Sequence, residues 1–129
     1  MPSTATATLG PIGQVAMNAH DLPRAIRFYR DALGLPLLFE APPKMAFFDC
    51  AGVRLMLSLP ERAEYDHAGS ILYFRVPDIE AAHRDMTARG VAFEGPPHLV
   101  ARMPDHELWM TFFTDSEGNT LALMSERRP

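Results

Sequence analysis

The sequence predicts an α+β fold made of two copies of one module, each a strand followed by a helix and then three more strands. Two observations support this prediction. Residues 15–22 and 72–79 both run from a strand pattern into an aspartate, and each is followed by an amphipathic stretch that ends at a glycine. Later in each half, residues 52–58 and 118–124 begin with a glycine and carry leucines at alternate positions. A repeat of this length that occurs twice indicates a duplicated module rather than a solenoid.

Both predicted helices have recognisable starts and ends. Asp21 and Asp78 precede them, and an aspartate in this position accepts hydrogen bonds from the free N–H groups of the first turn. Pro23 suits a first turn, because its missing donor would be unpaired there in any case. Gly34 and Gly90 end the helices, because glycine enters the left-handed conformation at a helix C-terminus at little cost.

Alternation along the predicted strands assigns their two faces. The face toward the helices consists of Val15, Met17, Val53, Leu55, Leu57, Leu72, Phe74, Val76, Leu121 and Leu123. The opposite face consists of Gln14, Ala16, Asn18, Arg54, Met56, Ser58, Ile71, Tyr73, Arg75, Thr120, Ala122 and Met124. This second set includes large apolar side chains, so it cannot face only water. A curved sheet with a concave ligand cavity accounts for both faces.

The composition excludes several kinds of partner. The formal net charge is −4, whereas a nucleic-acid-binding protein carries a basic patch. No apolar run approaches the ~20 residues of a membrane span. The single cysteine, Cys50, excludes an intrachain disulfide, and we interpret it as part of a strand. We therefore expect a cytoplasmic protein that binds neither nucleic acid nor membranes, with residues 1–10 forming a flexible N-terminal tail.

Two stretches of the chain resemble a known superfamily. Residues 21–35 (DLPRAIRFYRDALGL) resemble the first helix of vicinal oxygen chelate proteins, the glyoxalase, bleomycin-resistance and dioxygenase-like superfamily. Residues 115–124 (DSEGNTLALM) resemble their closing turn and last strand. The resemblance implies one domain over residues 11–126, with modules at about 11–60 and 68–126. It also implies an eight-stranded, incompletely closed barrel of two βαβββ modules around a cavity, and a homodimer.

In the metalloenzymes of this superfamily, the first and last strands of each module hold a divalent ion. The resemblance places the four ligand positions on Gln14, Met56, Ile71 and Ala122. Only Gln14 offers an oxygen atom, and one neutral amide does not hold a hard divalent cation. We therefore expect no metal cofactor.

The segment 96–109 carries the histidine–carboxylate cluster of the chain, with His98, Asp105, His106, Glu107 and the single tryptophan, Trp109. We expect a turn-rich loop with solvated charges there. Two alternatives stay open. His98 and His106 would form a displaced metal or acid–base site, although their spacing matches no ligand motif. Otherwise the loop would cover the cavity, with Trp109 in contact with a ligand.

The expected cavity still offers groups that bind organic molecules. The candidate ligand-binding residues are Gln14, Asn18, Arg54, Met56, Ser58, Ile71, Tyr73, Arg75, Trp109, Thr120 and Ala122. Arg54 and Arg75 would suit a carboxylate or a phosphate, unless both reach the rim and are solvated. The sequence assigns no catalytic residue.

Three functions follow, in this order. The first is metal-free binding of a small organic molecule, as in the antibiotic-sequestering members of the superfamily. The second is a metal-independent or displaced-metal enzyme that acts on a small acid or an aldehyde-derived adduct. The third is a metal-dependent lyase, isomerase or dioxygenase, for which the ligands of the ion are missing.

Overall fold

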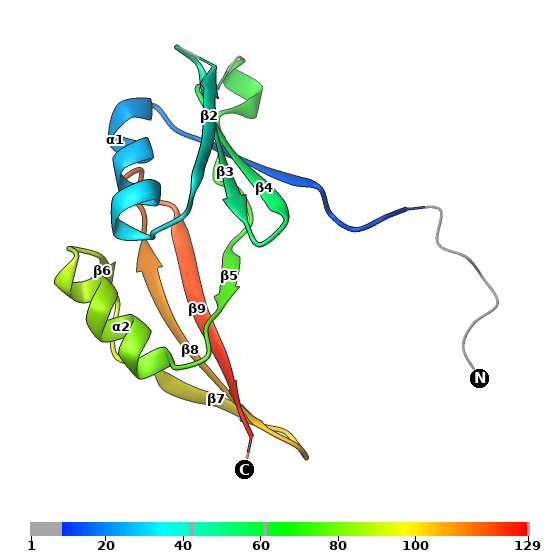
Figure 1. Ribbon diagram of the computed structural model, residues 1–129, viewed down its shortest axis with the longest axis vertical. Coiled ribbons are helices and arrows are strands. Elements are labelled where there is room, and N and C mark those ends of the chain that lie inside the picture. Colours follow the sequence, from blue (N-terminus) through cyan, green and yellow to red (C-terminus); the bar gives the residue numbers. More distant parts are fainter. Residues whose placement is uncertain (1–8, 42, 61, 129) are drawn as a thin grey trace.

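The computed structural model describes residues 9–41, 43–60 and 62–128 (Figure 1). Residues 1–8, most of the expected N-terminal tail, lie outside the described residues. The first half of the chain forms β1 (Gln14–Asn18), α1 (Leu22–Arg27), the π-helical turn η1 (Phe28–Ala32), β2 (Leu37–Ala41), β3 (Met45–Cys50) and β4 (Val53–Ser58). After the short helix η2 (Ala63–Tyr65), the second half forms β5 (Leu72–Arg75), α2 (Ile79–Ala88), β6 (Ala92–Phe93), β7 (His98–Arg102), β8 (Glu107–Thr114) and β9 (Thr120–Arg127).

Each half of the chain builds its own sheet. The strand order is β1-β4-β3-β2 in the first sheet and β5-β9-β8-β6 in the second, where β7 also pairs with β8. β1 runs parallel to β4, and β5 runs parallel to β9. The two sheets stay separate and do not close into a barrel. Two separate sheets agree with a barrel that is incompletely closed. The predicted fold of two repeated modules is therefore confirmed.

The second sheet differs from the first by an interruption in one strand. β6 and β7 both pair with β8, so they share the position of a single strand. Pro96 and Pro97 lie between them, and proline has no N–H group for the ladder. β7 and the start of β8 fall inside the segment 96–109. The expectation of a turn-rich loop over this segment is therefore wrong for most of it, because only residues 96–97 and the hairpin turn 103–106 lie outside the strands.

The helix boundaries agree with the sequence prediction. A side-chain oxygen of Asp21 accepts a hydrogen bond from the backbone N–H of Arg24 at 3.1 Å, and Asp78 caps α2 in the same way. Gly34 and Gly90 have φ angles of +76° and +93° at the ends of the helices. Among the described residues, none of the helices has the length and apolar character that a membrane span requires.

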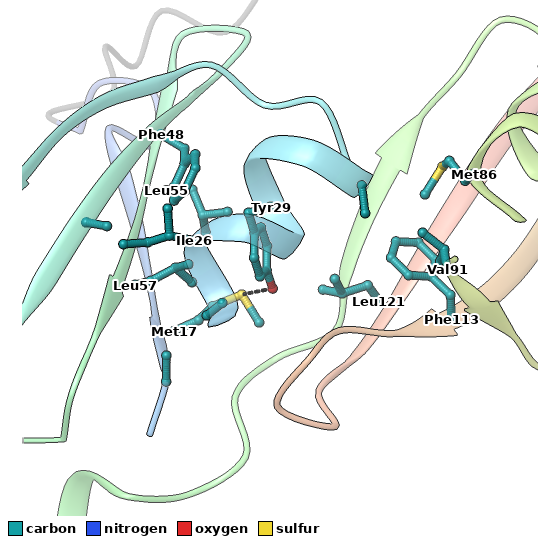
Figure 2. Packing of buried hydrophobic residues seen from close by; sticks show 14 of the residues in the cluster. Met17, Ile26, Tyr29, Phe48, Leu55, Leu57, Met86, Val91, Phe113 and Leu121 are labelled. Atoms are coloured by element: carbon teal, nitrogen blue, oxygen red, sulfur yellow. Dashed lines mark hydrogen bonds between the residues drawn. The ribbon is translucent and has the colours of Figure 1, made fainter. Parts of the chain in front are cut away.

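The apolar core contains residues from both modules (Figure 2). α1 lies against β3 and β4, while α2 lies against β6, β8 and β9. Nine of the ten strand residues predicted to face the helices are buried or packed against this core, and Val53 is half-buried outside it. The nine are Val15, Met17, Leu55, Leu57, Leu72, Phe74, Val76, Leu121 and Leu123. The opposite sheet faces are therefore the ones that the helices do not cover.

A buried tyrosine joins the two modules. Tyr29 lies on the helical segment of the first module and is fully buried. Its hydroxyl donates a hydrogen bond of 2.6 Å to the carboxylate of Asp115, which begins the turn between β8 and β9. Burial, followed by the charge of Asp115, raises the pKa of Tyr29 far above its ordinary value. Tyr29 therefore stays protonated and remains a donor to Asp115.

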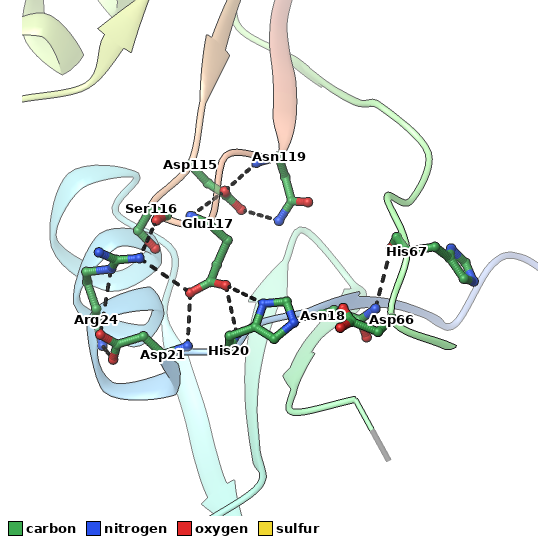
Figure 3. Close-up of polar contacts among 10 residues, drawn as sticks. All are labelled: Asn18, His20, Asp21, Arg24, Asp66, His67, Asp115, Ser116, Glu117 and Asn119. Atoms are coloured by element: carbon green, nitrogen blue, oxygen red, sulfur yellow. Dashed lines mark hydrogen bonds and ion pairs between the residues drawn. The ribbon is translucent and has the colours of Figure 1, made fainter. Parts of the chain in front are cut away.

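The same turn carries a second contact between the modules (Figure 3). The Glu117 carboxylate accepts hydrogen bonds from the backbone N–H groups of His20 (2.7 Å) and Asp21 (3.1 Å). The His20 ring lies 3.2 Å from Glu117 and 2.8 Å from Asp66 in the segment that links the modules. Hydrogen bonds to Asp66 and then Glu117 raise the pKa of His20. Burial alone would raise the pKa of Glu117, but these backbone and imidazole hydrogen bonds lower it overall.

Candidate functional site

Each sheet has one face that points away from the helices, and we call it the open face. On the open face of the first sheet, an arginine and a glutamine form a pair. Gln14 on β1 and Arg54 on β4 are paired in register. The Arg54 Nε atom donates a 2.7 Å hydrogen bond to the side-chain oxygen of Gln14. The amide nitrogen of Gln14 lies 3.8 Å from the sulfur of Met56. Three of the side chains that the sequence places on this face are therefore brought together.

Two phenylalanines extend this group across the sheet. Phe47 on β3 pairs with Met56, and its ring lies 5.5 Å from the guanidinium carbon of Arg54. Phe39 on β2 stacks on Phe47 with a ring-centre distance of 4.4 Å, and half of its surface is exposed. Neither residue was predicted as part of the site. Phe47 follows from the alternation in Met45–Cys50, whereas Phe39 required the pairing of β2 with β3.

The second sheet carries the other predicted residues. Tyr73 on β5 and Phe112 on β8 flank Ala122 of β9, and their rings meet edge to face at 5.9 Å. Arg75 is exposed, and its guanidinium lies 3.7 Å from the carboxylate of Glu126. Such an exposed ion pair leaves Arg75 available to a ligand at little cost.

The remaining candidate residues lie on the open faces of the two sheets or next to them. Asn18 and Ser58 are paired at the far ends of β1 and β4, on the face of Gln14. Thr120 begins β9 on the face of Ala122. Ile71 lies just before β5 and is 43% exposed.

Trp109 lies on the wrong side of its sheet for the proposed role. It pairs with Ser125, whereas Phe112 pairs with Ala122, so the two lie on opposite faces of β8. The Trp109 ring packs against the core and lies 4.2 Å from the guanidinium carbon of Arg127. Trp109 therefore does not lie on the face of Tyr73 and Ala122, where it was expected to contact a ligand.

The two histidines of the weak alternative metal site are also kept apart. His98 begins β7, and His106 follows the turn at its other end. His106 instead lies 2.8 Å from Asp105, which also accepts a hydrogen bond from Arg128 at 2.9 Å. Over the part of the chain that the structure describes, no three side chains of histidine, cysteine, aspartate or glutamate are placed to hold a metal ion.

The four positions that correspond to metal ligands in the superfamily do not fit a divalent ion. The oxygen of Gln14 already accepts a hydrogen bond from a guanidinium cation. Met56 offers a soft thioether, and Ile71 offers no donor atom. Ala122 is fully buried and likewise offers none. Hard divalent ions require several oxygen or imidazole ligands, so this set of side chains cannot hold one.

The open faces of both sheets are exposed to solvent in a single chain. Gln14, Arg54, Tyr73 and Arg75 are all exposed, although they alternate with buried core residues. The arrangement therefore supplies two cationic groups and several aromatic rings on an accessible surface, with hydrogen-bond donors that suit an anion.

Sequence comparison decides the family. The profile of the Glyoxalase/Bleomycin resistance protein/Dioxygenase superfamily matches residues 11–123. The chain belongs to this superfamily. Among curated proteins, the uncharacterized protein YraH of Bacillus subtilis (strain 168) is 29% identical, and the match covers 74% of this chain and 91% of that protein.

Several solved structures share the fold. A member from Sphaerobacter thermophilus DSM 20745 has a TM-score of 0.75 at 24% identity, over 93% of this chain and all of that one. Lactoylglutathione lyase from Agrobacterium tumefaciens has a TM-score of 0.70 at 25% identity, over 96% and 95% of the two chains. TnmS3, an antibiotic binding protein from Streptomyces sp. CB03234, has 0.72 at 23%, over 94% and 99%. The fold thus serves both a lyase and a binding protein.

Proposed function

We propose that the protein binds a small organic anion, without a metal ion, on the face around Gln14 and Arg54. The contact that carries this proposal is the hydrogen bond from Arg54 to Gln14. It places a permanent positive charge beside the side-chain oxygen of Gln14. This is the one oxygen atom among the side chains at the four positions that hold the metal ion in the metalloenzymes of the superfamily. A guanidinium there repels a divalent cation and attracts a carboxylate.

The chemistry of this face defines the ligand further. The Nε atom of Arg54 is used by Gln14, while its two Nη atoms have no hydrogen-bond partner among the described residues. Two N–H groups in a fixed plane match a carboxylate. Phe47, Phe39 and Met56 lie beside them and offer an apolar surface to a ring. An aromatic carboxylate satisfies both parts of the site.

In this proposal the protein forms a homodimer, and the second copy of the chain covers the open surface around Arg54. Phe39, Ile71 and Tyr73 are each 43–50% exposed on the two open faces. Exposed apolar side chains on sheet faces that no helix covers are suited to an interface. A homodimer in which the open faces meet would turn the surface around Arg54 into a cavity. Sedimentation equilibrium should therefore find a dimer, and Phe39→Glu should shift the protein toward the monomer.

The binding proposal is tested by titrating the protein with 1-naphthoate in a calorimeter. Arg54→Met should weaken binding by about ten- to a hundredfold, because a hydrogen bond to a charged group contributes about 1.5–3 kcal/mol. The matched control is Arg84→Met on α2, which removes the same charge far from this face and should leave the affinity unchanged. The neutral analogue 1-naphthalenemethanol should bind the wild-type protein as weakly as 1-naphthoate binds Arg54→Met.

Two outcomes would overturn this proposal. Equal loss of affinity in Arg54→Met and Arg84→Met would mean that only net charge matters. Unchanged affinity in Arg54→Met would remove Arg54 from the site. Conversion of the added carboxylate to a product would instead support the second candidate function, a metal-independent enzyme that acts on a small acid.

A further inference from the structure

A cavity lies on the helix-facing side of the molecule. It has a volume of about 380 Å³. The end of the first helical segment and the β3–β4 turn form one wall, and the core of the second module forms the other. Its lining includes Cys50, Phe74, Val76, Met86, Phe113 and Leu123. The five residues from Phe74 onward lie on helix-facing positions. Gln14 and Arg54, which carry the proposed anion site, do not line this cavity, whereas Arg75 does.

The duplicated modules show what is unusual about this cavity. Strand pairing makes Phe48 and Phe113 equivalent, because they pair with Leu55 and Leu121 respectively. Tyr29 and Met86 are also equivalent, since they follow the two capping aspartates at the same distance along the chain. The first module thus has a tyrosine at the position where the second has a methionine.

In the first module the tyrosine ring fills the space between the helix and the sheet. Tyr29 is fully buried, its hydroxyl lies 3.6 Å from the sulfur of Met17, and its ring centre lies 6.0 Å from that of Phe48 (Figure 2). In the second module, the equivalents of these residues are Met86, Phe74 and Phe113, and all three line the cavity. The cavity therefore occupies the place that corresponds to the Tyr29 ring.

The polar end of the site differs between the modules as well. In the first module the Tyr29 hydroxyl meets Asp115, the residue that begins the β8–β9 turn. The equivalent of Asp115 is Cys50 in the first module, which ends β3 and lines the same cavity as Met86. Burial raises the pKa of the Cys50 thiol, so this group is neutral. The lining is therefore mostly apolar, and its polar members are the Cys50 thiol and two residues of opposite charge, Asp49 and Arg75.

We infer that this cavity binds a small neutral aromatic molecule of about the size of phenol or indole. Its volume falls within the range of roughly 300–1,000 Å³ that is usual for ligand sites. The ring of the ligand would take the place of the missing tyrosine ring, against Phe74, Met86 and Phe113. Its hydroxyl or N–H group would point to the turn that carries Cys50.

The probe for this inference is 4-methylphenol, the side chain of tyrosine as a free molecule. With methionine methyl groups labelled with ¹³C, NMR should show a saturable shift of the Met86 signal during titration. The Met56 signal, on the opposite face, should not move. In parallel, the probe should slow alkylation of Cys50 by N-ethylmaleimide with the same concentration dependence. Cys50 also lines a neighbouring cavity of about 220 Å³, so the Met86 signal is the deciding one.

A pair of variants separates this cavity from other sites. Met86→Tyr supplies the missing ring and should weaken binding of the probe by about tenfold or more, a loss of about 1.4 kcal/mol, as seen by protection of Cys50. Met86→Leu keeps the cavity and should protect Cys50 like the wild type.

Three results would overturn the inference. They are the absence of a saturable shift at Met86, a shift of Met56 alone, and equal protection of Cys50 in Met86→Tyr and Met86→Leu. If Met86→Tyr does not fold, the titration of the wild-type protein decides the question by itself.

Discussion

The Tyr29 hydroxyl donates its hydrogen bond to a carboxylate of the other module, that of Asp115, at 2.6 Å. Asp115 is buried and also accepts hydrogen bonds from the backbone N–H groups of Glu117 and Asn119, both at 2.8 Å. A buried carboxylate that is held by several donors fixes its neighbours in one arrangement. The pair therefore sets the orientation of the two modules, and with it the position of their open faces.

Loss of this hydrogen bond should destabilise the whole fold. We expect Tyr29→Phe to lower the free energy of unfolding by about 1–3 kcal/mol, because the buried carboxylate loses a donor while the ring remains. Urea denaturation followed by circular dichroism measures this change. The control is Tyr73→Phe, which removes an exposed hydroxyl and should change stability by less than about 0.5 kcal/mol. Equal effects of the two variants would contradict the role of Tyr29.

The contact of His20 with Asp66 and Glu117 should make stability depend on pH. The pKa of His20 is raised above its ordinary value of 6.5 in the folded state. Its contribution is therefore fully present below about pH 6.5 and is lost as the pH rises through the higher folded-state pKa. We expect the wild-type protein to lose more stability than His20→Gln between about pH 5.5 and pH 8.5.

This pH dependence is measured by urea denaturation at both pH values. Glu117 and Asp66 face the imidazole, and Arg24 lies 3.8 Å from Glu117. The lowered pKa of Glu117 means that this carboxylate stays charged across the window, so it does not contribute to the change. His98→Gln, at an exposed position of β7, serves as the control. The prediction fails if the His98→Gln and His20→Gln variants respond to pH in the same way.

The turn between β3 and β4 has a residue in an unfavourable conformation. Ala51 and Gly52 form a two-residue hairpin loop with φ angles of +50° and +95°. Asparagine adopts this left-handed region more readily than alanine does, and Asn-Gly suits such turns. Ala51→Asn should therefore raise the free energy of unfolding by up to about 1 kcal/mol.

Thermal unfolding and urea denaturation both report this gain. Ala68→Asn is the matched control, because Ala68 is exposed and its φ angle is not positive. It should leave stability unchanged. A gain of the same size in both variants would show that the backbone conformation of Ala51 is not the cause.

Much of the fold could be predicted because it follows from local patterns. Capping aspartates, terminal glycines and alternating strand residues identified both modules and both faces of β1, β4, β5 and β9. β2 was not assigned, because its sequence, LLFEA, does not alternate. The division of one strand into β6 and β7 depends on Pro96 and Pro97, whose effect on pairing requires knowledge of the partner strand.

Prediction of the site was weaker where it depended on contacts between distant segments. Alternation placed Gln14, Arg54 and Met56 on one face, yet only the register of β1 with β4 brings Arg54 onto Gln14. Trp109 was assigned to a loop, so its place in the alternation of β8 was not used. The contacts of His20 with Asp66 and Glu117 leave no pattern in the sequence, because they join three segments far apart in the chain.

The last prediction concerns metal ions. We expect purified protein that has been loaded with Ni²⁺, Mn²⁺ or Zn²⁺ and then desalted to retain no stoichiometric ion by elemental analysis. The reason is the donor set: the Gln14 oxygen is engaged by the Arg54 cation, and Met56 and Ala122 supply no hard ligand. Arg54→Met removes the repelling charge but leaves one amide oxygen, so this variant should also retain no ion.

Gln14→Ala shows where any retained ion is bound. An ion that stays in this variant binds elsewhere on the protein, and the prediction for the superfamily position stands. One equivalent per chain that is bound by the wild-type protein and lost in Gln14→Ala would contradict it. Such an ion would have to displace the Arg54 guanidinium from the Gln14 oxygen. The affinity for 1-naphthoate should then change when the metal is added, which links this measurement to the proposed anion site.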